Sequence, residues 1–130
     1  MTEQTITDVM DPARACAMQA ALGMTPDIAY GSALPPFFHH LYFWEPEPPA
    51  KLGRDGHPKL GGLIPDLGLS RRMWAGGRLT FLQPLVAGIK ADKTTTLDSV
   101  TQKDGAQGPM AFVRLRHDIR QRHATVLTEW

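Results

Sequence analysis

The clearest pattern in the chain is an alternation of mainly apolar and mainly charged positions over residues 111–120. One set of alternate positions is Ala111, Val113, Leu115, His117 and Ile119, and the other is Phe112, Arg114, Arg116, Asp118 and Arg120. Because successive side chains of a strand point to opposite faces, the pattern predicts a strand. One face should pack against a core, and the other should be solvated or meet a partner.

Segments with strand character flank this one, and turn-forming residues separate them. Strands are predicted over residues 79–82, 89–101 and 124–130, where threonine or alternating apolar residues are frequent. A bend is predicted at residues 84–88, a hairpin turn at Lys103-Asp104-Gly105 and a further turn at 120–122. The second half of the chain therefore indicates an antiparallel meander.

The first third of the chain has helical character. Asp11 is a favoured N-cap, Pro12 is tolerated in a first helical turn, and Gly23 supplies a stop, so a helix is predicted over about residues 12–22. The aromatic window 33–44 is predicted to be buried or to face a ligand, with a short helix or a strand starting near Pro36. A helix followed by a meander indicates an α+β domain in which the helix packs on a curved antiparallel sheet.

Length, charge and cysteine content restrict the class of protein. The chain has 130 residues, which fits one domain, and its formal net charge is +1, which argues against nucleic acid as a partner. The lone Cys16 cannot form an internal disulfide and is expected to be a small core residue. No signal peptide and no membrane-spanning run is expected, so the cytoplasm is the predicted location.

Two histidine-containing segments are candidates for chemistry. His39 and His40 are either core or rim histidines or ligand-binding residues. Adjacent histidines alone do not make a metal site, because zinc needs three or four converging ligands, so none is expected. Asp55 and His57 lie two residues apart in a predicted loop, where the carboxylate can orient the imidazole for acid–base work. The alternative is an Asx-type turn beside a solvent-exposed histidine.

The segment Arg71–Leu85 places charged donors at the start of the predicted sheet. Arg71, Arg72 and Arg78 are candidates for binding phosphates or a substrate carboxylate, since guanidinium groups bind such oxygens bidentately. A solvated strand entrance or a subunit interface would explain the same residues. Trp74, Gly76 and Gly77 lie between these arginines and complete the predicted rim of a binding site.

Several short motifs of the chain are considered together because the same family carries all of them. They are Leu34-Pro35-Pro36 with His39-His40-Leu41-Tyr42-Phe43, then Asp55-Gly56-His57-Pro58, and Arg71-Arg72-Met73-Trp74-Ala75-Gly76-Gly77-Arg78-Leu79. This set resembles the MaoC-like dehydratases and hydratases of the hot-dog fold. The resemblance is to the N-terminal half of the mesaconyl-C4-CoA hydratase and hydroxyacyl-thioester dehydratase type, and it runs from about residue 10 to the end.

The resemblance implies a single hot-dog domain over residues 1–130 and a hydro-lyase acting on enoyl or 3-hydroxyacyl thioesters of coenzyme A or acyl carrier protein. The thioester substrates that the resemblance implies include those of short dicarboxylic acids with four or five carbons. In this family a carboxylate and a histidine activate water, and no metal or redox cofactor is required. The catalytic Asp and His belong to the second hot-dog half, so this chain resembles the half that shapes the pocket. A homodimer or a heteromer with a second hot-dog subunit is expected.

The sequence differs from the family pattern at some positions, and other functions also fit it. Gly88-Ile89 stands where the family commonly has Gly-Asp. Asp118 and His123 have the Asp-x4-His spacing of the hydratase motif, but they fall on a predicted strand and turn rather than at a helix start. A non-catalytic acyl-thioester-binding scaffold and a hot-dog thioesterase are the alternative functions, since fold does not fix function.

Overall fold

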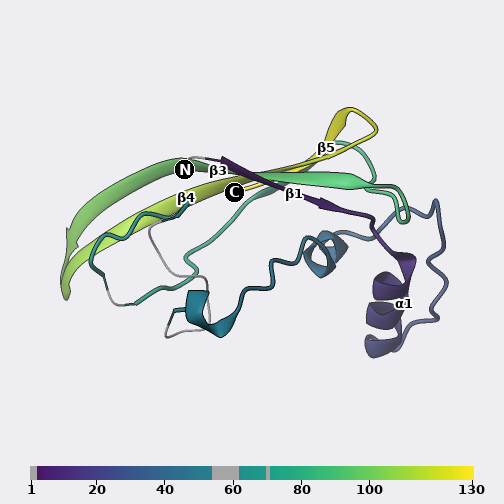
Figure 1. Cartoon of the computed structure of the whole chain (residues 1–130), viewed down its shortest axis with the longest axis horizontal. Helices are drawn as coiled ribbons and strands as arrows, with labels where there is room; N and C mark the ends of the chain where they lie inside the picture. The colour runs from purple at the N-terminus through teal and green to yellow at the C-terminus, as the bar shows by residue number, and fades with distance from the viewer. Residues whose placement is uncertain (1–2, 54–61, 70) are drawn as a thin grey trace.

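A computed structural model describes residues 3–53, 62–69 and 71–130 of the chain. Within these residues the strands form one antiparallel sheet with the order β1-β3-β4-β5-β2. The strands are β1 (Glu3–Asp8), β2 (Leu79–Phe81), β3 (Ala91–Gly105), β4 (Gly108–Gln121) and β5 (Ala124–Glu129). Figure 1 shows the sheet as a curved layer, with the helix and the irregular segments on one side of it. The prediction of an α+β chain with an antiparallel sheet is confirmed.

β3 and β4 form the centre of the sheet as one long hairpin. Their pairing runs from Ala91↔Gln121 to Gly105↔Gly108, with a register shift between Leu97 and Ser99. The predicted turn at Lys103-Asp104-Gly105 is therefore misplaced, because these residues stay in the ladder and the turn lies at 106–107. Pairing along the full length of both strands outweighs the local turn preference of Asp-Gly.

The turn between β4 and β5 also lies slightly later than predicted. β4 continues through Gln121, and Arg122 and His123 form the turn with φ angles of 53° and 65°. Positive φ at both central residues is the geometry of a two-residue type I′ hairpin loop, whose twist matches that of the flanking strands. The strand prediction for the final segment is confirmed by β5.

The one α-helix of the described residues, α1 (Pro12–Ala21), begins as the sequence predicts. The Asp11 carboxylate accepts a hydrogen bond of 2.9 Å from the backbone N–H of Ala13, and Gly23 with φ +76° follows the helix end. In Figure 1, α1 lies below one end of the sheet, beside the 3-10 turn η1 (Phe38–Leu41). The aromatic window is therefore a short helical turn rather than a strand. A second 3-10 turn, η2 (Pro49–Lys51), follows it.

The hydrophobic core fills the space between the sheet, α1 and the segments that carry η1. The two large side chains that are fully buried are Met10, just after β1, and Ile119 on β4. The other core members are Ala15, Ile28, Leu34, Phe38, Tyr42, Phe43, Leu85, Ala87, Ala91, Val126 and Leu127. The opposite face of the sheet carries polar pairs such as Thr5 with Thr94 and Thr7 with Asp92. Among the described residues, the core therefore lies on the concave face of the sheet (Figure 1).

A buried glutamine fastens the bend between β2 and β3. The side-chain amide of Gln121 donates to the backbone carbonyls of Val86 and Ile89, at 2.9 and 2.7 Å, and its oxygen accepts from the N–H of Val86 at 2.9 Å. Gly88 lies in this bend with φ +83°, and its N–H donates to the carbonyl of Met10 at 2.7 Å. Gln121 thus satisfies backbone groups of the Gly88-Ile89 segment from the end of β4.

Candidate active site

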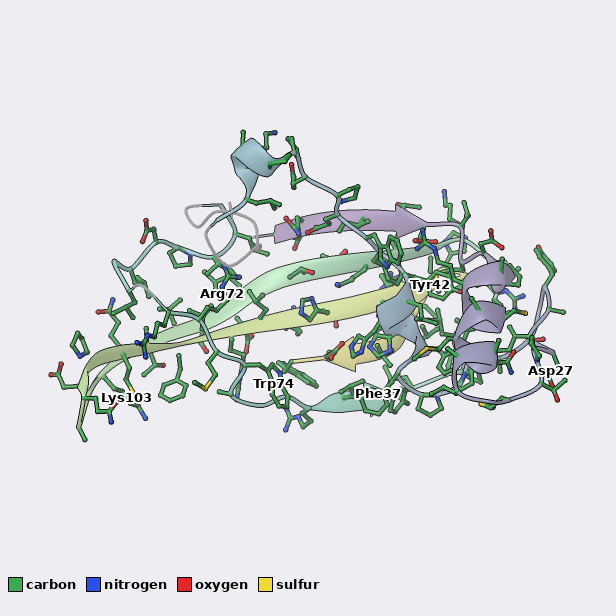
Figure 2. The ribbon with its side chains drawn as sticks, turned by 90° about the horizontal axis from the view of Figure 1, so that it is seen from below. Asp27, Phe37, Tyr42, Arg72, Trp74 and Lys103 are labelled. Carbon is green, nitrogen blue, oxygen red and sulfur yellow. The ribbon has the colours of Figure 1, made fainter. Side chains whose placement is uncertain are left out.

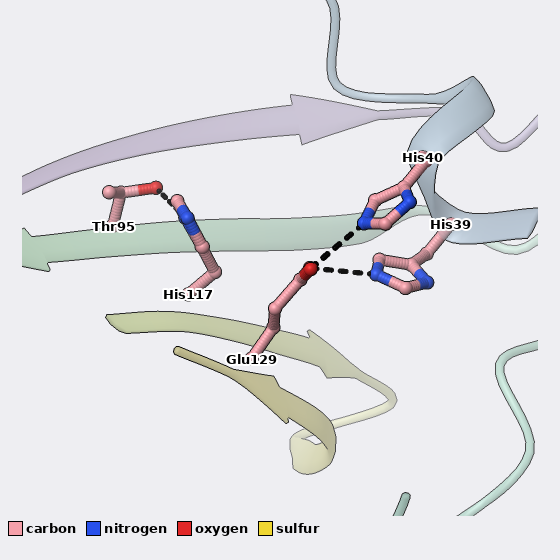
Figure 3. Close-up of polar contacts among 5 residues, drawn as sticks. All are labelled: His39, His40, Thr95, His117 and Glu129. Atoms are coloured by element: carbon pink, nitrogen blue, oxygen red, sulfur yellow. Dashed lines mark hydrogen bonds and ion pairs between the residues drawn. The ribbon is translucent and has the colours of Figure 1, made fainter. Parts of the chain in front are cut away.

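Three polar side chains form a row across the concave face of the sheet. Thr95 on β3 is the ladder partner of His117 on β4, and His117 is the ladder partner of Glu129 on β5. Directly paired residues of antiparallel strands project to the same face, so the three side chains are neighbours there. Figure 3 shows them below η1, which brings two further histidines to the row.

His39 and His40 both contact the Glu129 carboxylate. Nε2 of His39 lies 2.9 Å from Oε2, and Nε2 of His40 lies 3.0 Å from each carboxylate oxygen (Figure 3). An ionised carboxylate can only accept hydrogen bonds, so each imidazole donates an N–H from Nε2. His39 is buried, whereas His40 is exposed. One acidic side chain therefore joins two histidines that lie about 90 residues away in sequence.

The turn that carries these histidines is fixed by contacts on both sides. Phe37, with φ 73°, precedes it, and Phe43, with φ 62°, follows it. The N–H of Phe43 donates to the Asp8 carboxylate at 3.0 Å, and the hydroxyl of Tyr42 donates to the carbonyl of Asp11 at 2.7 Å. The Arg14 guanidinium donates to the carbonyl of Leu41 at 3.1 Å. The end of β1 and the start of α1 therefore hold η1 over the sheet.

The electrostatics of Glu129 favour its ionised form. Burial of the side chain would raise the pKa of its carboxyl group, but the hydrogen bonds from His39 and His40 and the charges of the same residues lower it to about 2. Hydrogen bonds to the charged form favour that form. Glu129 is therefore an anion throughout the physiological pH range.

His117 has the opposite character. Burial, together with the nearby positive charge of Lys93, lowers the pKa of its imidazole to about 4. Its Nδ1 shares a hydrogen bond of 2.8 Å with the hydroxyl of Thr95 (Figure 3). At neutral pH His117 is thus an uncharged imidazole beside an ionised carboxylate. A general base works best with a pKa near the operating pH, so these lowered pKa values suit hydrogen bonding and charge placement better than proton abstraction.

A cavity of about 850 Å³ opens beside this row. Residues 74–78 form one wall, residues of β3 and β4 form the other, and His117 and Glu129 border it. Trp130 closes one side: its N–H donates to the carbonyl of Arg78 at 2.9 Å, and the N–H of Arg78 donates back at 3.2 Å. The Arg78 guanidinium lies 4.4 Å from the centre of the Trp130 ring. Figure 2 shows Trp74 on the segment that leads to β2.

A second, mostly apolar cavity of about 410 Å³ lies on the other side of η1. Its walls come from residues 33–36 and 81–85, and Leu127 and His39 complete it. His39 therefore borders the apolar cavity, while its partner Glu129 borders the larger one. The His39–Glu129 contact therefore joins the lining of one cavity to the lining of the other.

The structure brings some of the predicted site residues together and leaves others apart. Trp74, Gly76, Gly77 and Arg78 line the larger cavity. His39 and His40 lie together at Glu129. Arg71 and Arg72 are exposed and precede the cavity wall without being among the residues that line it in the described part of the chain. Asp55 and His57 lie outside the described residues, so their predicted pairing remains a prediction.

Sequence reasoning did not select Glu129 or His117 for the site. The alternation of residues 111–120 places His117 on the packed face of β4, and a histidine on that face is the available signal. Glu129 lies two residues beyond the buried Leu127 on β5, so a carboxylate on the apolar face of the last strand was the corresponding signal. Their convergence with His39 and His40 depends on η1, which local patterns do not position.

The Asp118–His123 spacing does not form a hydratase site. Asp118 lies on β4, where its carboxylate accepts hydrogen bonds from Arg116 at 3.1 Å and Thr128 at 2.9 Å. His123 lies in the following turn and its backbone carbonyl accepts from Arg120. Neither residue is at a helix start, as expected from the sequence.

A carboxylate and a neutral imidazole thus border a cavity on the concave face of an antiparallel sheet, and a cavity with a few such polar groups is a candidate small-molecule site. Comparison with known proteins gives the family. Residues 37–130 match the hydroxyacyl-thioester dehydratase type 2 family, and the chain belongs to it. The chain is also 37% identical over 131 residues to the mesaconyl-C(4)-CoA hydratase of Chloroflexus aurantiacus.

The match covers 98% of this chain but 46% of that relative, so the chain spans about half of the relative's length. Among the residues that the structure describes, no helix is both long enough and apolar enough to cross a membrane.

Proposed function

We propose that this chain is one half of a hydro-lyase that adds water to enoyl thioesters, or removes it from 3-hydroxyacyl thioesters. In the hydration direction the water oxygen bonds to the β-carbon and a proton is delivered to the α-carbon. Membership of the dehydratase family and the likeness to a hydratase support this reaction class. A thioester of coenzyme A or of acyl carrier protein is the proposed substrate.

The observation that carries the proposal is the position of the larger cavity at an open part of the sheet. β5 pairs with β4 only from His117 onward, so among the described strands the residues of β4 before His117 have β3 as their one neighbour. The cavity lies along this stretch and is bounded by residues 74–78. A second hot-dog domain at this edge would close the cavity from its open side.

The second domain is proposed to supply the catalytic Asp and His, while this chain shapes the pocket. This division fits a chain that spans 46% of its relative. The second domain is either another copy of this chain or a separate hot-dog subunit. Each half would then adopt the hot-dog arrangement, in which a helix is enclosed by a curved antiparallel sheet.

The arginines before and within the cavity wall are proposed to bind the anionic parts of the substrate. Arg78 lines the cavity, and Arg71 and Arg72 lie on the exposed segment that leads to it. Their guanidinium groups suit the phosphates of the carrier or the free carboxylate of a C4 or C5 dicarboxylic acyl group. Asp55 with His57 remains a proposed accessory acid–base pair.

The proposal is tested by following the loss of enoyl-thioester absorbance with the purified chain alone, and then together with a hot-dog protein that carries the hydratase Asp and His motif, if the neighbouring reading frame encodes one. We expect turnover only when both are present. Turnover by the chain alone would rule out the scaffold and the separate subunit, and would assign the second half to another copy of this chain. Binding of the thioester without turnover in either mixture would favour a scaffold, and release of free thiol would favour a thioesterase.

A further inference from the structure

The three side chains that meet below η1 have the composition of a metal site. His39 and His40 offer two imidazole nitrogens and Glu129 offers a carboxylate oxygen, with all ligand atoms within 4.8 Å of one another. In the part of the chain that the structure describes, this is the one such group. We propose that His39, His40 and Glu129 bind one divalent transition-metal ion in six-coordinate geometry. The inference does not depend on the proposed hydro-lyase function.

Two of the three separations between ligand atoms favour octahedral over tetrahedral geometry. Nε2 of His39 and Nε2 of His40 lie 2.9 and 3.0 Å from the same oxygen of Glu129. With metal–ligand distances of about 2.1 Å, a separation near 3.0 Å corresponds to an angle of about 90° at the metal, whereas a tetrahedral ion would need about 3.4 Å. Two histidines and one carboxylate fill three positions of an octahedron and leave three open.

Two of the ligands are held before a metal arrives, and the ion replaces the Nε2 proton that each histidine donates to Glu129 in the metal-free chain. Glu129 is fixed on both sides, because β5 pairs with β4 at His117 and with β2 at Leu79. His39 is buried, with 6% of its surface exposed, on a turn that β1 and α1 hold in place. Ligands that are held in place lose little conformational freedom on binding, which strengthens a small site.

His40, the third ligand, leaves the proposed site open to an ion from solvent. The side chain of His40 is 53% exposed, so its ring can adjust to an incoming ion. Glu129 also borders the larger cavity, so the open coordination positions lie near the space proposed for the substrate. Two imidazole nitrogens and one carboxylate oxygen suit Fe²⁺, Co²⁺, Ni²⁺ or Zn²⁺ better than Mg²⁺ or Ca²⁺, which prefer oxygen ligands.

The experiment measures binding of Ni²⁺ and Co²⁺ to the full chain after EDTA treatment and buffer exchange, by isothermal titration calorimetry. We expect one ion per chain in the wild type and the weak visible absorption of six-coordinate Co²⁺. His40→Ala and Glu129→Gln should each weaken binding at least about tenfold, since even residues outside the ligand set change metal affinity by that factor. His123→Asn, a histidine in the exposed β4–β5 turn, is the matched control and should bind as the wild type does.

His40 is exposed, so His40→Ala is expected to fold, and circular dichroism checks this. The proposal is overturned if the wild type binds neither ion, or if the folded His40→Ala variant binds as tightly as the wild type. Loss of binding in His123→Asn would place the ion elsewhere and would also overturn it. Intense bands of four-coordinate Co²⁺ would contradict the octahedral geometry.

Discussion

Glu129 lies directly opposite His117 in the ladder between β4 and β5, so an ionised carboxylate and a neutral imidazole share one face of the sheet. Both residues titrate far from their ordinary ranges, and they do so in different pH windows. The pKa of Glu129 is lowered to about 2 and that of His117 to about 4. The pH dependence of stability can therefore separate their contributions.

Replacing His117 should reduce the acid sensitivity of the fold. The unfolded imidazole binds a proton below its usual pKa of 6.5, whereas the folded one does so only near 4. The unfolded state then holds more protons between these values, so stability is complete above pH 6.5 and falls as the pH decreases toward 4. We expect the thermal midpoint of His117→Asn to change less between pH 7 and pH 4.5 than that of the wild type, measured in EDTA. Equal changes in both proteins would contradict the assignment.

The loss of folding stability that comes from protonation of Glu129 occurs at lower pH. A carboxyl group whose folded pKa is about 2 and whose ordinary value is 4.5 contributes stability above pH 4.5 and loses it as the pH falls through the folded value. His117→Asn should leave this more acidic part of the profile in place. The same series of thermal midpoints, extended to pH 2.5, measures it.

Adjacent glycines in the cavity wall should respond differently to alanine. A Cβ atom on Gly77 would lie 2.9 Å from the backbone carbonyl oxygen of Trp130, whereas a Cβ on Gly76 meets no atom within 4 Å. Gly77→Ala therefore forces the wall away from Trp130 and should destabilise the chain by about 1–3 kcal/mol, the usual cost of overpacking. Gly76→Ala is the matched control and should leave stability nearly unchanged. Urea unfolding and tryptophan fluorescence measure both effects, and equal behaviour of the two variants would refute the proposed close approach.

The glutamine that fastens the bend between β2 and β3 should be important for stability. Gln121→Leu leaves three backbone groups of Val86 and Ile89 without the hydrogen bonds that Gln121 makes. Unsatisfied buried polar groups cost about 1–3 kcal/mol each, so we expect a loss of at least about 2 kcal/mol. Gln102→Leu, an exposed position on β3, is the control for loss of an amide in a strand. Urea unfolding compares the two variants, and a loss no larger than that of the control would show that the bend does not depend on Gln121.

Arginine 72 should affect substrate binding more than the chemical step. In the assembled enzyme we expect Arg72→Ala to raise KM several-fold while kcat changes little, because a phosphate contact binds the ground state and the transition state alike. Lys90→Ala removes an exposed positive charge elsewhere and is the control. Unchanged kinetics for Arg72→Ala would leave this segment with a structural role only.

Local signals account for the parts of the fold that the sequence predicts well. The alternation of residues 111–120 and the Asp11-Pro12 start of α1 are each contained in one short segment, and both agree with the structure. β1 was not predicted, because Glu3–Asp8 contains one strongly apolar residue, Ile6, and gains its order from pairing with β3. The hairpin turn moved from 103–105 to 106–107 because the strand ladder, rather than Asp-Gly, sets its position.

The candidate site is predictable only in part, because local sequence patterns do not report contacts between distant residues. The segments with His39, His40 and residues 74–78 were recognised from their composition and their resemblance to a family. Glu129 joins them through contacts that span about 90 residues of sequence. Contacts of this range follow from the packing of η1 on the sheet, which no local pattern encodes.

The long β3–β4 hairpin has a consequence for the order of folding. Its strands are neighbours in sequence, so their pairing closes a short loop, whereas Thr5 meets Thr94 across 89 positions. Loop closure costs more entropy as loops lengthen, so local pairs form first. We therefore expect the centre of this hairpin to exchange its amide protons most slowly and β1 to exchange them first. The histidines reach Glu129 only after the sheet exists, so assembly of the site should be one of the last events in folding.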